Sequence, residues 1–212
     1  MARRMADPKF REQQRAHRKD AHIASINEFV AALQEPNGRG WVPEVAPLHG
    51  GVDATVLSVL RDPGPKTQKG KGSSFLCIEN DDPTAERQWH LFNEFGIPVR
   101  QVLPWNAYPW YINRAPRAAE REQGAAVLAD LIDRLPDLLI VLLQGNDAVD
   151  TWRRLEKAHP TLVKERKLQV VESIHPGKQA LWTADPVQRE ARIAKQRKAF
   201  ERVAAALSAD HL

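Results

Sequence analysis

The feature that most constrains this chain is a series of four short apolar runs, each followed by a longer segment of helical character. The runs are Ala54–Leu60, Gln101–Leu103, Leu138–Leu143 and Leu168–Glu172. They are rich in Leu and Val and almost continuously apolar, which is typical of strands buried on both faces of a parallel sheet. Parallel strands need a long crossover connection, and helices usually supply it.

Helical segments lead into these runs, separate them and close the chain. We expect them at Asp20–Leu33, Pro83–Phe95, Ala118–Leu135, Asn146–Ala158 and Pro186–Leu207. The alternation predicts the α/β class, as a three-layer α/β/α sandwich on a four-stranded, mostly parallel central sheet. We expect one domain over residues 20–212, preceded by a basic, flexible N-terminal segment over residues 1–19.

The composition limits the cellular compartments and the kinds of metal or disulfide site that we expect for this protein. Among 212 residues the only cysteine is Cys77, so we expect neither a disulfide framework nor an iron–sulfur cluster or other cysteine-based metal site. No apolar run approaches the length of a membrane span, and the N-terminus lacks the apolar core of a signal peptide. We expect a cytoplasmic, nucleoid-associated protein. Its net charge of +4 fits either a polyanion-binding surface or solvated polar faces.

Polar residues follow the apolar runs, and their types differ. "RDPGP" follows the first run, "PWNAYPWY" the second, "QGNDA" the third and "SIHPGKQ" the fourth. Ligands of open parallel sheets bind beyond the carboxyl ends of the strands, where these segments converge. The sequence therefore predicts that Asp62, Asn106 and His175 share one rim.

Several common site motifs do not fit. Five residues, rather than four, separate Gly64 from Gly70, and Gly72 rather than Ser or Thr follows Lys71, which excludes a phosphate-binding P-loop. No H-E-x-x-H pair and no G-x-S-x-G elbow occurs, so neither the zinc hydrolase nor the serine hydrolase pattern is present.

With these residues considered together, the chain resembles the uracil-DNA glycosylase superfamily. "RDPGP" is similar to its first motif, and Phe75 in "GSSFL" matches a Phe on the loop that follows. Asn106 matches an Asn at the end of the second strand, and "SIHPGK" matches its last motif. The similarity spans roughly residues 50–207. Leu60 stands where the first motif usually has Gly, and the lysine-rich insert before Phe75 is not typical.

The resemblance implies a DNA glycosylase that flips uracil, or a related 5-substituted pyrimidine, out of DNA and hydrolyses its N-glycosidic bond. It implies no cofactor and no metal, and we expect a monomer that binds DNA. Asn106 would read the base edge, Phe75 would stack on the base, and Gly64 would leave room at its C5 atom. His175 would donate a hydrogen bond to O2 of the departing base, and Asp62 would orient water or stabilise the positive sugar.

The resemblance also implies a DNA-binding surface around the pocket. Lys66, Lys69 and Lys71 would hold phosphates, since a flexible basic loop can contact the backbone on either side of a flipped nucleotide. Lys178 would add a further DNA contact, and Leu181 or Trp182 would act as the apolar wedge that fills the gap left by the base. The simpler interpretation of the lysines is a solvated insert.

Two alternatives remain open from the sequence. The first is a member of the same superfamily that binds nucleic acid or nucleobases but has lost the chemistry, which the unusual Leu60-Arg61-Asp62 motif favours. The second is a metal-dependent nucleotide hydrolase with Asp62, Glu79 and Asp81 as ligands. Simpler interpretations also exist for the site residues: Asp and Asn, the residue types at positions 62 and 106, are common in turns.

Overall fold

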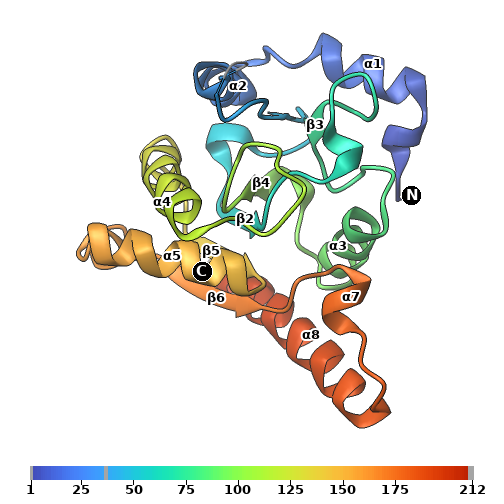
Figure 1. Ribbon diagram of the computed structural model, residues 1–212, viewed down its shortest axis with the longest axis vertical. Helices are drawn as coiled ribbons and strands as arrows, with labels where there is room; N and C mark the ends of the chain where they lie inside the picture. Colours follow the sequence, from blue (N-terminus) through green and yellow to red (C-terminus); the bar gives the residue numbers. More distant parts are fainter. Residues whose placement is uncertain (1, 36–37, 210–212) are drawn as a thin grey trace.

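The centre of the protein is a four-stranded sheet in which all strands are parallel. The computed structural model describes residues 2–35 and 38–209. The strands are β2 (Val56–Leu60), β4 (Val102–Asn106), β5 (Ile140–Gln144) and β6 (Gln169–Ser173). They are arranged in the order β4-β2-β5-β6 (Figure 1). The prediction of an α/β protein with a four-stranded parallel central sheet is confirmed.

Strand β4 extends further than the apolar pattern indicated. The apolar run ends at Leu103, but the strand continues through Pro104 to Asn106. A proline lacks the N–H that a central strand needs, yet an edge strand tolerates it. Because β4 is an edge strand, Pro104 fits, and Asn106 becomes the last residue of the strand, aligned with Leu60 of β2.

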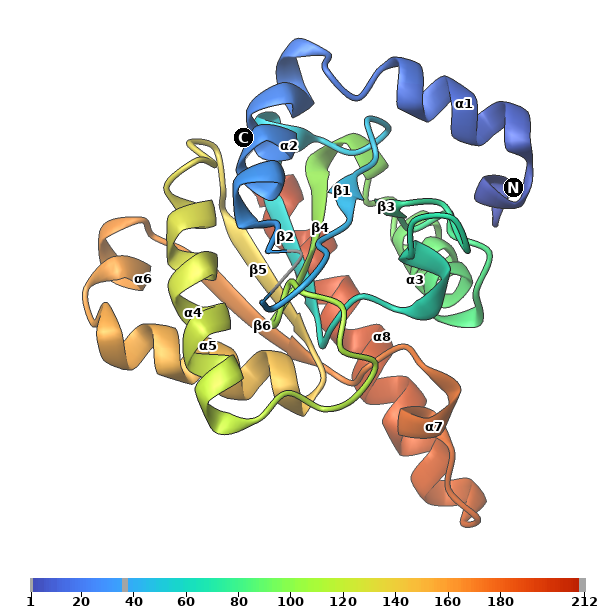
Figure 2. The same ribbon diagram turned by 45° about the horizontal axis from the view of Figure 1, so that its top comes forward.

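Helices cover both faces of the sheet, as the sandwich prediction requires. The five expected helices are α2 (Ala21–Leu33), α3 (Pro83–Glu94), α4 (Ala118–Ile132), α5 (Asn146–Ala158) and α8 (Pro186–Ala209). Helices α4 and α5 pack side by side on one face, and α3 and α8 lie on the other (Figure 2). The start of α3 follows the sequence pattern: Pro83 is its first residue, and the Asp82 side chain accepts hydrogen bonds from two backbone N–H groups.

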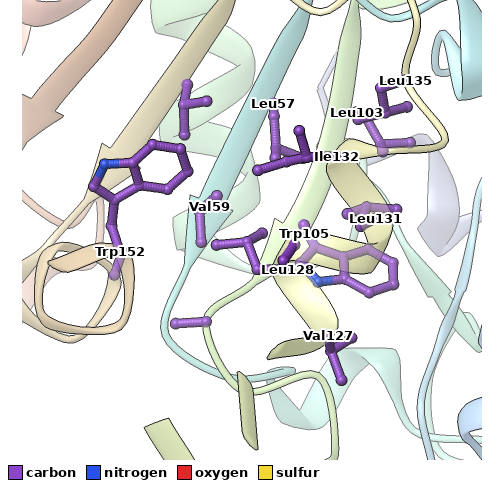
Figure 3. Close-up of a cluster of buried hydrophobic side chains, with 14 of the residues drawn as sticks. Leu57, Val59, Leu103, Trp105, Val127, Leu128, Leu131, Ile132, Leu135 and Trp152 are labelled. Atoms are coloured by element: carbon purple, nitrogen blue, oxygen red, sulfur yellow. The ribbon is translucent and has the colours of Figure 1, made fainter. Parts of the chain in front are cut away.

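Each helical layer has its own hydrophobic core. On one face, Leu128, Leu131 and Ile132 of α4 meet Leu57 and Trp105 of the sheet (Figure 3). The core of the opposite face is built from alternate strand residues and from α3 and α8. Its buried members include Val56, Ile140, Leu142, Phe92 and Phe200. Since successive strand residues face opposite sides, one continuous apolar run supplies both cores.

The structure adds short elements that the hydrophobic pattern did not indicate. They are helices α1 (Pro8–Ala16), α6 (Leu162–Glu165) and α7 (Lys178–Leu181), the paired strands β1 (Glu44–Val45) and β3 (Phe75–Leu76), and 3-10 turns at Arg4–Ala6, Gly51–Asp53, Pro65–Thr67 and Val99–Gln101. Elements of two to four residues are too short to produce a period. Within the described part of the chain, no helix has the length and apolar character that crossing a membrane would require.

The N-terminal segment is folded onto the domain, which differs from the flexible tail that the sequence suggested. Met5 is 2% exposed and packs with Phe75 and Cys77. Arg4 binds both carboxylate oxygens of Glu79, with Nε–Oε2 and Nη2–Oε1 distances of 2.7 and 2.6 Å. A buried apolar anchor and a bidentate ion pair give this polar segment a fixed place. The domain boundary at residue 20 stays a prediction.

The contact between α4 and the end of β4 generates a stability prediction. A Cβ atom added at Gly124 of α4 would lie 1.8 Å from the backbone oxygen of Ala107, directly after β4. Alanine has the higher helix propensity, but this contact forces α4 away from the sheet. We expect Gly124→Ala to lower the free energy of unfolding by about 2 kcal/mol, measured by urea denaturation. Gly64→Ala is the matched control, because a Cβ there meets no atom within 4 Å. Equal stability of the two variants would contradict the prediction.

Candidate active site

A cavity of about 630 Å³ opens at the carboxyl ends of the four strands. Every strand contributes residues to its wall, either at its last position or directly after it. They include Arg61 and Asp62 after β2, Asn106 of β4, Gln144 of β5 with Asp147 beyond it, and His175 after β6. The loop over residues 63–67 and the first turn of α3 also line the cavity. This is the position that the parallel sheet predicted.

Asp62 is a buried carboxylate with one free oxygen. Its side chain is only 3% exposed, and Oδ1 accepts a hydrogen bond from Arg61 Nε at 2.5 Å. Oδ2 is buried and has no hydrogen-bond partner among the described residues. Burial raises the pKa of Asp62, although the neighbouring Arg61 opposes this effect. The free oxygen can therefore accept a hydrogen bond or a proton from a molecule in the cavity.

His175 is held as a neutral imidazole of defined tautomer. Its Nδ1 accepts a hydrogen bond from the backbone N–H of Gly177 at 2.9 Å, so the ring proton must reside on Nε2. Burial, together with the positive charge of Arg61, lowers the pKa of His175 to about 4, against the opposing effect of Asp147. At neutral pH the ring offers an uncharged Nε2–H donor.

Two glycines fix the place of the His175 ring. A Cβ atom at Gly177 would lie 2.9 Å from Nδ1, within the space that the hydrogen bond uses. Gly145, between β5 and α5, has a φ of 101°, and a Cβ there would lie 3.0 Å from the His175 Cβ. Such a φ favours glycine. The H-P-G and Q-G-N segments therefore position the His175 ring through their backbone geometry as well as contributing side chains to the cavity.

Asn106 presents an unpaired amide to the same cavity. The residue is 2% exposed, and its Oδ1 atom is buried without a hydrogen-bond partner among the described residues. An amide of this kind carries one acceptor and two donors, and leaving the acceptor unpaired in a buried position is unfavourable. The simpler interpretation, an Asn that closes a turn through its own side chain, would have left Oδ1 hydrogen-bonded.

The structure brings most of the predicted pocket residues together. Asp62, Gly64, Asn106 and His175 all line the cavity, and Lys66 and Lys178 line it as well. A Cβ atom at Gly64 would meet open space, so this position leaves room in the cavity.

Phe75 is not among the cavity residues, contrary to the sequence-based expectation of a stacking residue. It is 1% exposed in β3 and packs with Met5, Ala46 and Cys77. Phe75 lines the wall of a separate groove instead, whereas the neighbouring Leu76 and Cys77 line the cavity. Strands of two residues leave no pattern in the sequence, so the pairing of β3 with β1 could not be predicted.

The lysine-rich loop divides between two surfaces. Lys66 lines the cavity and lies 3.3 Å from Asp81 Oδ2. Lys69 instead lines a separate groove of about 420 Å³, together with Arg15, Arg18 and Trp41. Lys71 is exposed and lines neither space. The loop closes on itself, because Ser73 N–H binds the backbone oxygen of Lys66 at 2.9 Å.

The expected wedge residues lie on and next to α7. Leu181, the last residue of α7, is half-buried and does not line the cavity. Trp182 follows it and is 64% exposed, so it is not the core residue that a tryptophan usually is. The guanidinium carbon of Arg189 lies 6.0 Å from the centre of its ring. Of the two, Trp182 is the more exposed.

Sequence reasoning missed several polar residues of the cavity, notably Arg61, Gln144 and Asp147. Each lies within three residues of a strand end, which is the signal that could have identified it. Asp147 lies in the first turn of α5 and forms an ion pair with Arg121 at 2.5 Å. Conversely, Glu79 binds Arg4, and Asp81 lies beside Arg3 and Lys66. Neither Glu79 nor Asp81 lines the cavity.

Comparison of the sequence with known protein families gives a match. The family model described as "Uracil DNA glycosylase superfamily" matches residues 48–207, which include every strand of the central sheet and every cavity residue. No curated protein sequence matches the chain.

The environment of His175 generates a prediction about its protonation. We expect its Cε1 proton resonance to titrate near pH 4 in an NMR experiment, rather than at the ordinary value of 6.5. Arg61→Gln should raise this pKa because it removes a neighbouring cation, and Asp147→Asn should lower it because it removes an anion. A wild-type midpoint at the ordinary value of 6.5 would contradict the neutral, buried histidine.

The same pKa affects stability. Between about pH 4 and 6.5 the unfolded chain binds a proton at this residue and the folded chain does not. The free energy of unfolding should therefore fall as the pH drops through this window, and His175→Asn should reduce the slope.

Proposed function

The chain belongs to the uracil DNA glycosylase superfamily, and on that basis we propose that it excises uracil, or a related 5-substituted pyrimidine, from DNA. Proteins of this superfamily act on DNA and generally hydrolyse N-glycosidic bonds. The target base would leave the stack and enter the cavity at the strand ends. The observation that carries the proposal is the neutral His175, whose Nε2–H donor belongs to the same cavity as Asp62 and Asn106.

Base selection would rest on Asn106. Its amide can donate to O4 and accept from N3–H of uracil, whereas cytosine presents the opposite pattern on that edge. The unpaired Oδ1 of Asn106 supports this role, because an N3–H donor would complete its hydrogen bonding. Gly64 would leave space for a substituent at C5, since a Cβ there meets no atom within 4 Å.

Bond cleavage would rest on His175 and Asp62. As the bond between C1′ and the base nitrogen breaks, its electron pair moves onto the base, and negative charge develops on O2. The His175 Nε2–H would donate a hydrogen bond to O2, and a neutral donor leaves the proton on the ring. The free Oδ2 of Asp62 would hold the attacking water or stabilise the positive sugar.

DNA would be held around the cavity by the basic loop and by α7. Lys66, Lys69, Lys71 and Lys178 would contact phosphates, and the apolar wedge would come from Leu181 or, with its greater exposure, Trp182. An exposed tryptophan can stack against a neighbouring base.

A binding-only member of the superfamily is the second candidate. The ion pair between Arg61 and Asp62 favours it, because a carboxylate neutralised by a guanidinium is a weaker proton acceptor. The metal-dependent hydrolase receives no support from the arrangement of acids, because Glu79 and Asp81 do not share the cavity with Asp62.

A panel of labelled oligonucleotides, each with one modified base, tests the proposal. After incubation, alkaline cleavage at abasic sites reports excision. We expect release of uracil, undiminished in EDTA. If none of the modified bases is released while the protein still binds the oligonucleotides, the binding-only candidate is correct.

The role of His175 predicts a separation of catalysis from binding. We expect His175→Ala to lower the single-turnover rate of uracil excision by about 100- to 1,000-fold, because a donor to the developing anion is lost. The DNA dissociation constant should change little, since phosphate contacts dominate affinity. His159→Ala, at an exposed position outside the cavity, is the control. A parallel loss of rate and affinity would identify His175 as a structural residue.

The basic loop predicts a salt-dependent affinity. Replacing Lys66, Lys69 and Lys71 with Gln should weaken binding about equally on all DNA sequences and reduce the slope of affinity against salt. A triple variant of Arg153, Lys157 and Lys164, exposed cations on α5 and α6, removes the same charge elsewhere and should change the slope less. Fluorescence anisotropy at several salt concentrations measures both. Equal effects of the two triple variants would exclude a specific role for the loop.

A further inference from the structure

Gln144 places an unpaired acceptor in the wall of the cavity. It is the last residue of β5, is fully buried at 0% exposure, and lines the cavity. Its Oε1 atom has no hydrogen-bond partner among the described residues. A buried acceptor without a donor is unfavourable for folding, so an atom of this kind at a ligand site indicates a missing partner.

The other end of this amide is hydrogen-bonded to two neighbouring side chains. Gln144 Nε2 donates to Ser58 Oγ of β2 and to Gln88 Oε1 of α3, both at 2.8 Å. The Ser58 hydroxyl also donates to Gln88 Oε1, at 3.4 Å. In this arrangement the Nε2 donors of Gln144 are used, and Oε1 is the atom of the side chain that is left without a partner among the described residues.

The sheet register places this acceptor across from Asn106. Leu60 of β2 aligns with Asn106, and Val59 aligns with Leu143, so Gln144 follows at the level of Leu60. Aligned residues of a parallel sheet face the same side, and the two backbones are two strand spacings apart, or about 10 Å. Two buried acceptors without partners, Asn106 Oδ1 and Gln144 Oε1, thus flank the end of β2.

Uracil can satisfy only one of these two acceptors. When N1 is joined to the sugar, the ring keeps a single strong donor, N3–H, which the proposed function assigns to Asn106. Gln144 Oε1 would then remain without a partner. A base that carries one more N–H or O–H group would supply it.

We propose that Gln144 Oε1 is a donor-reading subsite that favours damaged bases with one more hydrogen-bond donor than uracil. This inference rests on the proposed function and concerns the preferred substrate of the same cavity. The donor can come from a hydroxyl on a C5 substituent of a pyrimidine, for which Gly64 leaves space, or from an additional ring N–H of a deaminated purine.

Two pairs of bases distinguish these sources. The 5-hydroxymethyl and 5-formyl derivatives of uracil are similar in size, but the first offers a hydroxyl donor and the second only an acceptor. Xanthine likewise has a ring N–H where hypoxanthine has none. Excision of each base is measured for the wild type and for Gln144→Met, which keeps the length of the side chain and removes the acceptor.

For each pair, the rate of excision of the donor-bearing base is divided by that of the other base, and this preference is compared between the wild type and Gln144→Met. Within each pair the bases differ as leaving groups, but that difference is common to both enzymes and cancels. For at least one pair, we expect the preference for the donor-bearing base to be about 10-fold or more greater in the wild type than in Gln144→Met. Ser58→Ala is the matched control: Gln88 still holds Gln144 in place, so the preference should persist. Equal preferences of wild type and Gln144→Met for both pairs would overturn the inference, even if uracil is excised.

A binding measurement on the wild type tests the inference even if no base is excised or if Gln144→Met does not fold. Duplexes that carry 2′-fluoro analogues of the same four nucleotides resist hydrolysis and report affinity alone. The wild type should bind at least one donor-bearing member about 10-fold more tightly than its pair. This result without any excision would support the subsite and reject the glycosylase. Equal affinities within both pairs would overturn the subsite, whatever the outcome with Gln144→Met.

Discussion

The hydrogen-bonded register between β2 and its two neighbours is the constraint on which the rest of the structure depends. It aligns Val56–Leu60 with Val102–Asn106 on one side, and Val56–Val59 with Ile140–Leu143 of β5 on the other. Because all four strands are parallel, their carboxyl ends meet at one rim, and each connection must cross the sheet as a helix. The same alignment that buries two hydrophobic cores therefore brings together residues from distant parts of the chain.

Several polar atoms of the cavity at this rim are buried without a hydrogen-bond partner among the described residues, which is energetically unfavourable. Asp62 Oδ2, Asn106 Oδ1 and Gln144 Oε1 are all buried and lack partners within the described chain. Unpaired buried atoms also occur elsewhere in the described chain, among them His49 Nδ1 and Thr151 Oγ1, but the buried carboxylate and amide oxygens without a partner all belong to cavity residues. A protein selected for stability alone would pair or replace the cavity groups. Their concentration in one space is what separates a ligand site from an ordinary core.

The fold could be predicted from sequence because its signals are long and repeated. Four apolar runs and five helical segments specify the parallel sheet, and the residues after each run specify the rim. The site was predicted only in part. Asp62, Asn106 and His175 follow from strand ends, whereas the place of Phe75 depends on a two-residue strand pairing that leaves no pattern in the sequence. Gln144 was missed because a glutamine at the end of an apolar run is typical of the beginning of a loop. Only the contacts with Ser58 and Gln88 indicate its role.

The attachment of the N-terminal turn also bears on the order of folding. Arg4 and its partner Glu79 are separated by 75 positions in the chain, and the contacts of Met5 are with β3 and its surroundings. These interactions cannot form before β3 and the segment after it are in place, so the turn at Arg4–Ala6 cannot dock ahead of them. The central sheet does not include them, and they can detach while the sheet stays intact. Since Cys77, Asn80 and Asp82 belong to both that region and the cavity wall, one wall of the cavity is only as persistent as the docking of the Arg4–Ala6 turn.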